Sequence, residues 1–239
     1  MRTRLQLDML PQPDDTTCGP TCLHAIYRYY GDDIGLDEVI AEVSRLDGGG
    51  TLAVFLACHA LRRGYRATIY TYNLQIFDPT WFGPSDVDLR ERLQAQLAHK
   101  NLPALQAATA GYLEFLDRGG RLRLEDLTGA LIRKYLNRSI PILAGLSGTY
   151  LYRTHREFGP KYDYDDIRGH AAGHFVVLCG YDKRQRQAYL TDPLHPNPMG
   201  ASRQYRVHID RVVCSILLGI LTHDANLLII HPPSLRKGA

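Results

Sequence analysis

A cysteine at the predicted start of a helix constrains this chain more than any other feature of its sequence. Residues 12–22 read Gln-Pro-Asp-Asp-Thr-Thr-Cys-Gly-Pro-Thr-Cys. From Pro20 onward the apolar residues recur at three- and four-residue steps, which predicts a helix over 18–30. Proline is tolerated in a first helical turn because its missing N–H has no intrahelical partner there. We therefore expect Cys18 at a helix N-terminus, where free N–H groups and a partial positive charge favour the nucleophilic thiolate.

Two downstream segments offer a base for this thiol and a group that holds the base. Residues 173–182 read Gly-His-Phe-Val-Val-Leu-Cys-Gly-Tyr-Asp and predict a strand that opens with His174. Residues 188–193 predict a second strand that ends at Asp192, and the turn residues between the two favour an antiparallel hairpin. His174 and Asp192 would then lie at the same end of the hairpin. This is the arrangement of a general base and the carboxylate that orients it.

The same residues carry a resemblance to a known family. Gln12, Cys18, His174 and Asp192 occur in the order and local context of papain-like cysteine peptidases. The Cys-Gly-Pro entry and the Gly-His-Phe-Val-Val-Leu-x-Gly-Tyr-Asp segment with its following Asp-Pro most resemble the bacteriocin-processing group, family thirty-nine of these peptidases, which cleaves leader peptides after double glycine. The resemblance covers two short windows and says little about residues 31–138. Thr17 departs from the group, whose members usually have aspartate there, and no transporter domain is expected.

This resemblance implies a fold and a role for Gln12. The fold would be papain-like, with the active site in a cleft between a helical half and a β half. The side-chain amide of Gln12 and the backbone N–H of Cys18 would form the oxyanion hole. Losing one such donor costs about 100- to 1,000-fold in turnover.

Each role has a structural alternative. A free cysteine is commonly a small buried apolar residue, which is what we expect of Cys22, Cys58, Cys179 and Cys214. An Asp-Pro pair commonly starts a turn, although this is compatible with a catalytic Asp192. Of the other histidines, His59 and His155 are the next candidates for the base.

Composition excludes several classes of function. The net charge of +3 is too small to indicate a nucleic-acid partner. The five cysteines show no zinc-finger spacing and favour a reduced, cytoplasmic setting. The His170 and His174 pair does not lie on a predicted helix, so its spacing does not indicate a metal site. No metal or organic cofactor is expected. No signal peptide is visible, and the most apolar run, residues 212–221, is shorter than the roughly 20 residues of a membrane span.

The periodicities predict an α+β fold, with the nucleophile helix packed against a C-terminal antiparallel sheet. We expect one domain over residues 1–239, its helical half at about 13–138 and its β half at about 139–235. The predicted helices span 18–30, 37–45, 52–63, 88–100, 102–118 and 125–136, and the predicted strands span 67–72, 141–146, 174–181, 187–191, 204–209 and 226–231. Thr51 is expected to cap the helix at 52–63.

Together these features predict a thiol hydrolase that cleaves a peptide or amide bond through an acyl-enzyme. Two alternatives use the same sequence: an acyltransferase or peptide ligase with the same triad, and a non-catalytic peptide-binding module. The long segment 147–173, rich in tyrosine and charged residues, reads either as a lid or substrate-facing wall or as a solvated excursion. The substrate and the oligomeric state cannot be predicted from the sequence.

Overall fold

The computed structural model describes residues 2–83, 87–100 and 102–234. Its helices are α1 (Cys18–Tyr29), α2 (Leu36–Glu42), α3 (Ala53–Arg62), α4 (Leu89–Leu97), α5 (Pro103–Asp117), α6 (Gly129–Leu136), α7 (Gly148–Tyr152) and α8 (Ile209–Leu218). There are also two 3-10 helices: η1 (Pro79–Phe82) lies between β2 and α4, and η2 (Gly219–Thr222) lies between α8 and β10. The strands are β1 (Arg2–Arg4), β2 (Arg66–Thr71), β3 (Arg121–Arg123), β4 (Ile142–Ser147), β5 (Glu157–Phe158), β6 (Asp163–Tyr164), β7 (Gly173–Asp182), β8 (Gln187–Thr191), β9 (Gln204–His208) and β10 (Asn226–His231).

One large sheet forms the centre of the molecule, in the strand order β3-β2-β10-β4-β7-β8-β9, with β1 paired to β7. All its pairs are antiparallel except β2 with β3. The α+β prediction is confirmed, and so is the hairpin of β7 and β8. The sheet also takes strands β1, β2 and β3 from the first half of the chain. The division into a helical and a β half stays a prediction, and residues 1 and 235–239 lie outside the described residues.

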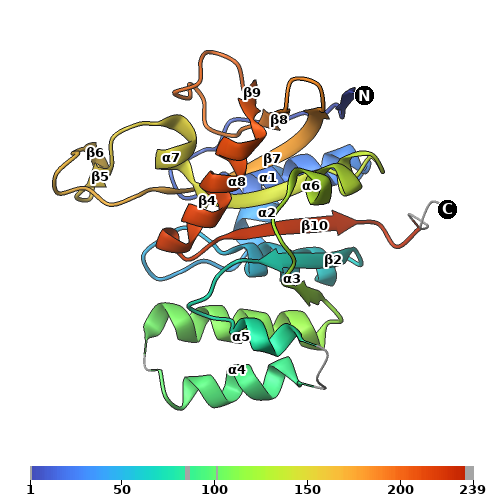
Figure 1. Ribbon diagram of the computed structural model, residues 1–239, viewed down its shortest axis with the longest axis vertical. Helices are drawn as coiled ribbons and strands as arrows, with labels where there is room; N and C mark the ends of the chain where they lie inside the picture. The colour runs from blue at the N-terminus through green and yellow to red at the C-terminus, as the bar shows by residue number, and fades with distance from the viewer. Residues whose placement is uncertain (1, 84–86, 101, 235–239) are drawn as a thin grey trace.

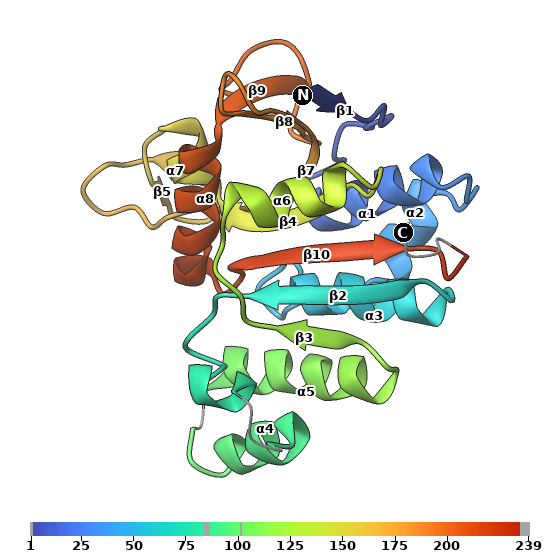
Figure 2. The same cartoon turned by 45° about the vertical axis from the view of Figure 1, so that its right-hand side comes forward.

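Helices cover both faces of the sheet (Figure 1, Figure 2). Helices α1 and α3 pack on one face, against β7 and against β2 and β10 respectively, and α6 and α8 pack on the other. This explains the sequence of β7, where nine consecutive residues from Gly173 onward are almost all apolar and eight of them are buried. A strand covered on both faces reads as a continuous apolar run and not as an alternating one.

An arm leaves this body between β4 and β7 (Figure 1). It begins with the short helix α7, turns at Arg153 in the left-handed conformation (φ 58°), and contains the two-stranded β5–β6 sheet. The end of the arm pairs with its beginning, because Glu157 and His170 exchange backbone hydrogen bonds at 3.0 and 2.8 Å. Part of the segment 147–173 is therefore ordered structure that the sequence did not predict.

Candidate active site

Helix α1 begins at the cysteine, and its first turn keeps N–H groups free. Thr17 occupies the N-cap position without a side-chain capping bond, because its hydroxyl exchanges hydrogen bonds with the backbone of Asp14 (3.0 and 3.2 Å). Pro20 has no N–H, and the first intrahelical bond runs from Thr21 to Thr17. The N–H groups of Cys18 and Gly19 therefore have no intrahelical partner and lie at the positive end of the helix dipole.

Gly19 allows the helix to approach its neighbours closely. A Cβ atom at this position would lie 2.6 Å from the Thr51 methyl group and 3.1 Å from the Phe175 ring. Phe175 is the residue after His174, so the glycine lets α1 sit directly against the start of β7. A larger residue here would force Thr51, Phe175 or the helix itself to shift.

The hairpin brings His174 and Asp192 together as predicted from the sequence. His174 is the second residue of β7, and Asp192 follows the last residue of β8. The His174 Nε2 atom lies 2.9 Å from Asp192 Oδ1. Asp192 is fully buried and His174 is nearly so. The carboxylate therefore holds the ring in one orientation with little competition from water.

The thiol of Cys18 lies near enough to the His174 imidazole to act on its charge. Because Nε2 is bonded to Asp192, Nδ1 is the ring atom left for the sulfur. Burial lowers the pKa of His174, but Asp192 and then Cys18 outweigh it and raise this pKa to about 10. Asp192 and Cys18 therefore both favour the imidazolium form of the ring over the neutral form. The structure thus places Cys18, His174 and Asp192 in one connected line.

Two tyrosines that the sequence analysis did not single out complete the surroundings of Asp192. The Tyr152 hydroxyl donates to Asp192 Oδ2 at 2.8 Å, and the Tyr205 hydroxyl donates to the same oxygen. The backbone N–H of Leu194 donates to Oδ1 at 3.0 Å. Burial raises the pKa of Asp192, but His174 and these phenols outweigh it, and the pKa is lowered. No spacing or periodicity signals these two contacts.

Gln12 lies beside the triad but its amide faces its own loop. Its backbone N–H donates to the carbonyl of Pro193, the residue after Asp192, at 2.9 Å. Its side-chain Nε2 donates to the carbonyl of Asp14 at 2.9 Å, while Oε1 is buried without a hydrogen-bond partner among the described residues. One N–H of the amide is thus engaged within residues 12–14, and the second remains for another acceptor.

The other candidates have structural partners. His59 is buried in α3, with Nδ1 2.8 Å from the Tyr27 hydroxyl and Nε2 3.0 Å from Glu42. His155 lies on the arm against the Tyr164 ring. Cys22 donates to the carbonyl of Phe175 at 3.3 Å, and burial raises its pKa well above the ordinary value. These residues pack the core or the arm.

The arm borders the site through Glu157. Burial and the neighbouring Asp15 raise the pKa of the Glu157 carboxyl group, and His174 opposes them. The carboxylate therefore lies in the electrostatic field of both the His174 imidazole and the loop before Cys18. Within the ranges described, no group of three or more His, Cys, Asp and Glu side chains is placed to hold a metal ion. No helix of those ranges has the length and apolar character needed to cross a membrane.

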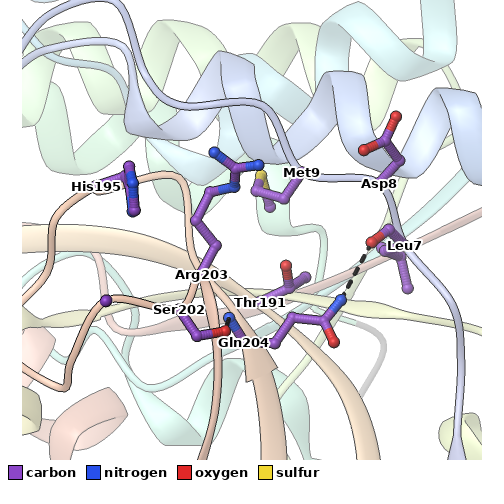
Figure 3. Close-up of a pocket in the computed structure, with 9 residues that line it drawn as sticks. Leu7, Asp8, Met9, Thr191, His195, Ser202, Arg203 and Gln204 are labelled. Atoms are coloured by element: carbon purple, nitrogen blue, oxygen red, sulfur yellow. Dashed lines mark hydrogen bonds between the residues drawn. The ribbon is translucent and has the colours of Figure 1, made fainter.

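A cavity of about 360 Å³ adjoins Asp192 without including the triad (Figure 3). It lies between the N-terminal segment and the β8–β9 connection, and Gln204 crosses it to donate to the carbonyl of Leu7. Its lining residues are Leu7, Asp8, Met9, Thr191, His195, Ala201, Ser202, Arg203 and Gln204. None of the four site residues predicted from the sequence lines this cavity.

Comparison with known proteins identifies a family for this sequence. Residues 4–212 match the model of the peptidase C39 like family. No curated protein matches the sequence.

Three solved structures align with nearly the whole chain at low sequence identity. A double glycine motif protease from an AMS/PCAT transporter, in complex with the leader peptide, is 16% identical over 96% of this chain and 94% of its own, with a TM-score of 0.45. A Bacillus anthracis protein described as a C39-like peptidase is 14% identical over 98% and 99%, with a TM-score of 0.49. The peptidase domain of Streptococcus ComA, a bi-functional ABC transporter of a quorum sensing pathway, is 15% identical over 95% and 98%, with a TM-score of 0.40.

Proposed function

Because the chain belongs to the peptidase C39-like family, we propose that it is a thiol hydrolase that cleaves a peptide or amide bond through Cys18, His174 and Asp192. The observation that carries the proposal is the line of contacts at one imidazole. His174 bonds to a buried carboxylate at 2.9 Å, and a cysteine at a helix N-terminus lies near enough to act on the charge of the same ring. Covalent catalysis by cysteine needs a base, a group that orients the base, and a nucleophilic thiol beside the base.

The reaction begins with the thiolate of Cys18 paired to the His174 imidazolium. The sulfur attacks the carbonyl carbon, and the carbonyl electrons move to its oxygen. The free N–H of Cys18 at the start of α1 and the second N–H of the Gln12 amide stabilise this oxyanion. The tetrahedral intermediate then collapses, the C–N bond breaks, and His174 gives its proton to the leaving amine.

Water completes the cycle. The acyl group is now a thioester on Cys18, and neutral His174 takes a proton from water as the oxygen attacks the same carbon. The C–S bond breaks, which releases the carboxylic acid and restores the thiolate and imidazolium. Asp192 stabilises the imidazolium throughout and does not itself change protonation state. All five cysteines are free, and a reducing, cytoplasmic compartment would keep Cys18 in the form this cycle requires.

The first test is the rate at which iodoacetamide alkylates each cysteine as a function of pH. We expect Cys18 to react fast at pH 6, below the ordinary thiol pKa of about 8.5, and to lose this reactivity in His174→Ala. Cys214 is free and partly exposed on α8, and serves as the internal reference for a thiol outside the site. An ordinary or unreactive Cys18 in both proteins would leave a peptide-binding module as the better reading.

A second test uses activity on peptide substrates. Cys18→Ala should abolish hydrolysis and change the free energy of unfolding by no more than about 1 kcal/mol, since the change removes one sulfur atom. Gln12→Ala should lower turnover by about 100-fold or more. Mass spectrometry of the products separates hydrolysis from acyl transfer, because a transferase would yield an amide or thioester of an added acceptor instead of the free acid.

A further inference from the structure

The carboxylate of Asp192 receives more hydrogen bonds than orienting His174 requires. His174 and the Leu194 backbone bond to Oδ1, and the Tyr152 and Tyr205 hydroxyls bond to Oδ2. The backbone N–H of Asp192 itself donates to the carbonyl of Arg203 at 2.9 Å. A buried carboxylate is thus fixed at both oxygens and at its main chain.

The two phenols reach Oδ2 from separate elements. Tyr152 is the last residue of α7, at the base of the arm, and its ring packs against the His174 ring with centroids 5.8 Å apart. Tyr205 lies on β9 and pairs with Leu190 of β8, two residues before Asp192. Neither contact follows from the β7–β8 hairpin, so the fold supplies them independently of the His174–Asp192 pair.

Resting on the proposed function, we propose that Tyr152 and Tyr205 are positioning residues that clamp Asp192, holding its Oδ1 toward His174 and keeping the carboxylate ionised. Without donors to Oδ2, the buried negative charge of Asp192 would lose two stabilising hydrogen bonds. The carboxylate would then tend either to take up a proton or to rotate. Either change would remove the fixed acceptor that stabilises the His174 imidazolium. The clamp therefore acts on Cys18 through two intermediates, Asp192 and His174.

The phenols remain donors under any working condition. Burial, followed by the charge of Asp192, raises the pKa of both Tyr152 and Tyr205. A neutral phenol can only donate to an ionised carboxylate at this distance, so the direction of both hydrogen bonds is fixed. The clamp consequently favours the charged form of Asp192 at every pH at which the enzyme is folded.

Other charged or titratable groups face this cluster from each packed element. They are Cys18 and Cys22 on α1, His174 on β7, Glu157 on the arm, and Arg211 on α8, which interacts with Tyr205. Only His174 and the two phenols have a hydrogen bond from a side chain to Asp192 among the described residues. These are the groups whose removal should change the protonation of Asp192 directly.

The test is the pH dependence of Cys18 alkylation and of peptide hydrolysis in Tyr152→Phe, Tyr205→Phe and the double variant. Phenylalanine keeps the ring and its packing and removes only the hydroxyl. Loss of each donor should raise the pKa of Asp192, so reactivity should fail at a higher pH on the acid side, by about one pH unit for each phenol removed. On the acid limb kcat should fall about tenfold for each phenol removed with KM unchanged, and it should return to the wild-type value at neutral pH.

A matched control separates this role from a structural one. Tyr72→Phe also removes a buried phenol oxygen, one that has no hydrogen-bond partner among the described residues, and should leave the acid limb in place. If the tyrosines had only a structural role, their loss would lower the folded fraction of the variants. The acid limb of the pH–reactivity profile would stay in place for the protein that remains folded. If the double variant does not fold, the two single variants decide the matter.

The outcomes also distinguish this inference from the proposed function. Wild-type Cys18 reactivity that does not depend on His174 contradicts the proposed function. Reactivity that depends on His174 but has the same acid limb in wild type, Tyr152→Phe and Tyr205→Phe leaves the function standing and overturns the clamp. An acid limb that moves upward in both single variants, further in the double variant and not in Tyr72→Phe supports it.

Discussion

A single glycine, Gly19, lets the first turn of α1 pack closely against its neighbours. At Gly19 the space for a side chain is taken by the Thr51 methyl group and by Phe175, the residue after His174. The Gly-Pro pair after Cys18 therefore has two functions. Pro20 has no N–H, but an N–H in the first turn of α1 would have no intrahelical acceptor. Gly19 lets that turn lie against β7.

We predict that Gly19→Ala destabilises the protein by about 1–3 kcal/mol, the usual cost of forcing an extra methyl group into a packed core. Urea unfolding measures the change. Gly48→Ala is the matched control, because a Cβ there meets nothing within 4 Å and the change should be neutral or slightly stabilising.

Thr51→Ser makes the prediction sharper. It removes the methyl group that a Cβ at residue 19 would contact at 2.6 Å. In the double variant with Gly19→Ala, part of the lost stability should return, which a double-mutant cycle detects as a favourable coupling. If Gly19→Ala lowers the free energy of unfolding equally with and without the Thr51 methyl group, that methyl group is not the source of the crowding.

Among the elements, the site hairpin was predictable and its supports were not. The run of residues 173–182, its turn and the strand that ends at Asp192 are local patterns, so the sequence shows the hairpin and the shared end of His174 and Asp192. The clamp by Tyr152 and Tyr205 depends on where α7 and β9 pack. A tyrosine hydroxyl finds its partner only in the folded protein, and no local pattern encodes that choice.

Helix α3 illustrates the same limit at its N-terminus. Thr51 was predicted to cap this helix, and that prediction is wrong: its hydroxyl donates to the carbonyl of Ser44, and Leu52 is the N-cap residue. The N–H of Ala53 donates instead to Asp224 Oδ2 at 2.7 Å. A carboxylate 171 residues away along the chain thus replaces the local cap, for the reason that any acceptor at a helix N-terminus satisfies its free donors.

Asp224 should make the stability of the protein depend on pH. Burial raises its pKa to about 7, although hydrogen bonds from Asn226 and Ala53 oppose this. Its unfolded pKa is near 3.9, so the native state binds the proton more tightly than the unfolded state does. The free energy of unfolding should therefore fall as the pH rises from about 4 to 7, by a few kcal/mol, and Asp224 should add no further slope above that.

Urea unfolding of wild type and Asp224→Asn across this range measures the effect. Asparagine retains an acceptor for the Ala53 N–H but does not titrate, so the difference in stability between the two proteins should shift in favour of the variant as pH rises. A difference that stays constant from pH 4 to 7 would mean that Asp224 is already ionised, or equally titratable, in both states.

At the scale of the whole molecule, the triad joins segments from opposite ends of the chain. Cys18 comes from the first helix, while His174 and Asp192 come from a hairpin in the sheet, and the Gln12 backbone ties the two together through Pro193. The sequence places these residues in two separate windows. Only the fold, which packs α1 against the start of β7, brings the thiol to the imidazole.

This convergence predicts a second pH window for stability, set by His174. Its pKa is about 10 in the folded protein, where burial is outweighed by Asp192 and Cys18, and near 6.5 when unfolded. The pair therefore stabilises the native state fully below about pH 6.5, and this contribution is lost as the pH rises toward 10, by a few kcal/mol. Since the tyrosines titrate in the unfolded chain near pH 10, the useful range ends at about pH 9.

His174→Gln isolates the contribution, because an amide can still donate to Asp192 but carries no titrating proton. Unfolding by urea at intervals from pH 6 to 9 should show the stability of wild type falling toward that of His174→Gln. The cause is that the unfolded wild type loses its imidazole proton near pH 6.5 while the folded protein still holds it. Titrating groups that do not interact with His174 are common to both proteins and cancel in the difference, whereas Asp192 and Cys18 belong to the pair being measured. Parallel curves over this range would mean that the fold does not hold His174 as an imidazolium, and the thiolate–imidazolium pair of the proposed mechanism would lose its support at the same time.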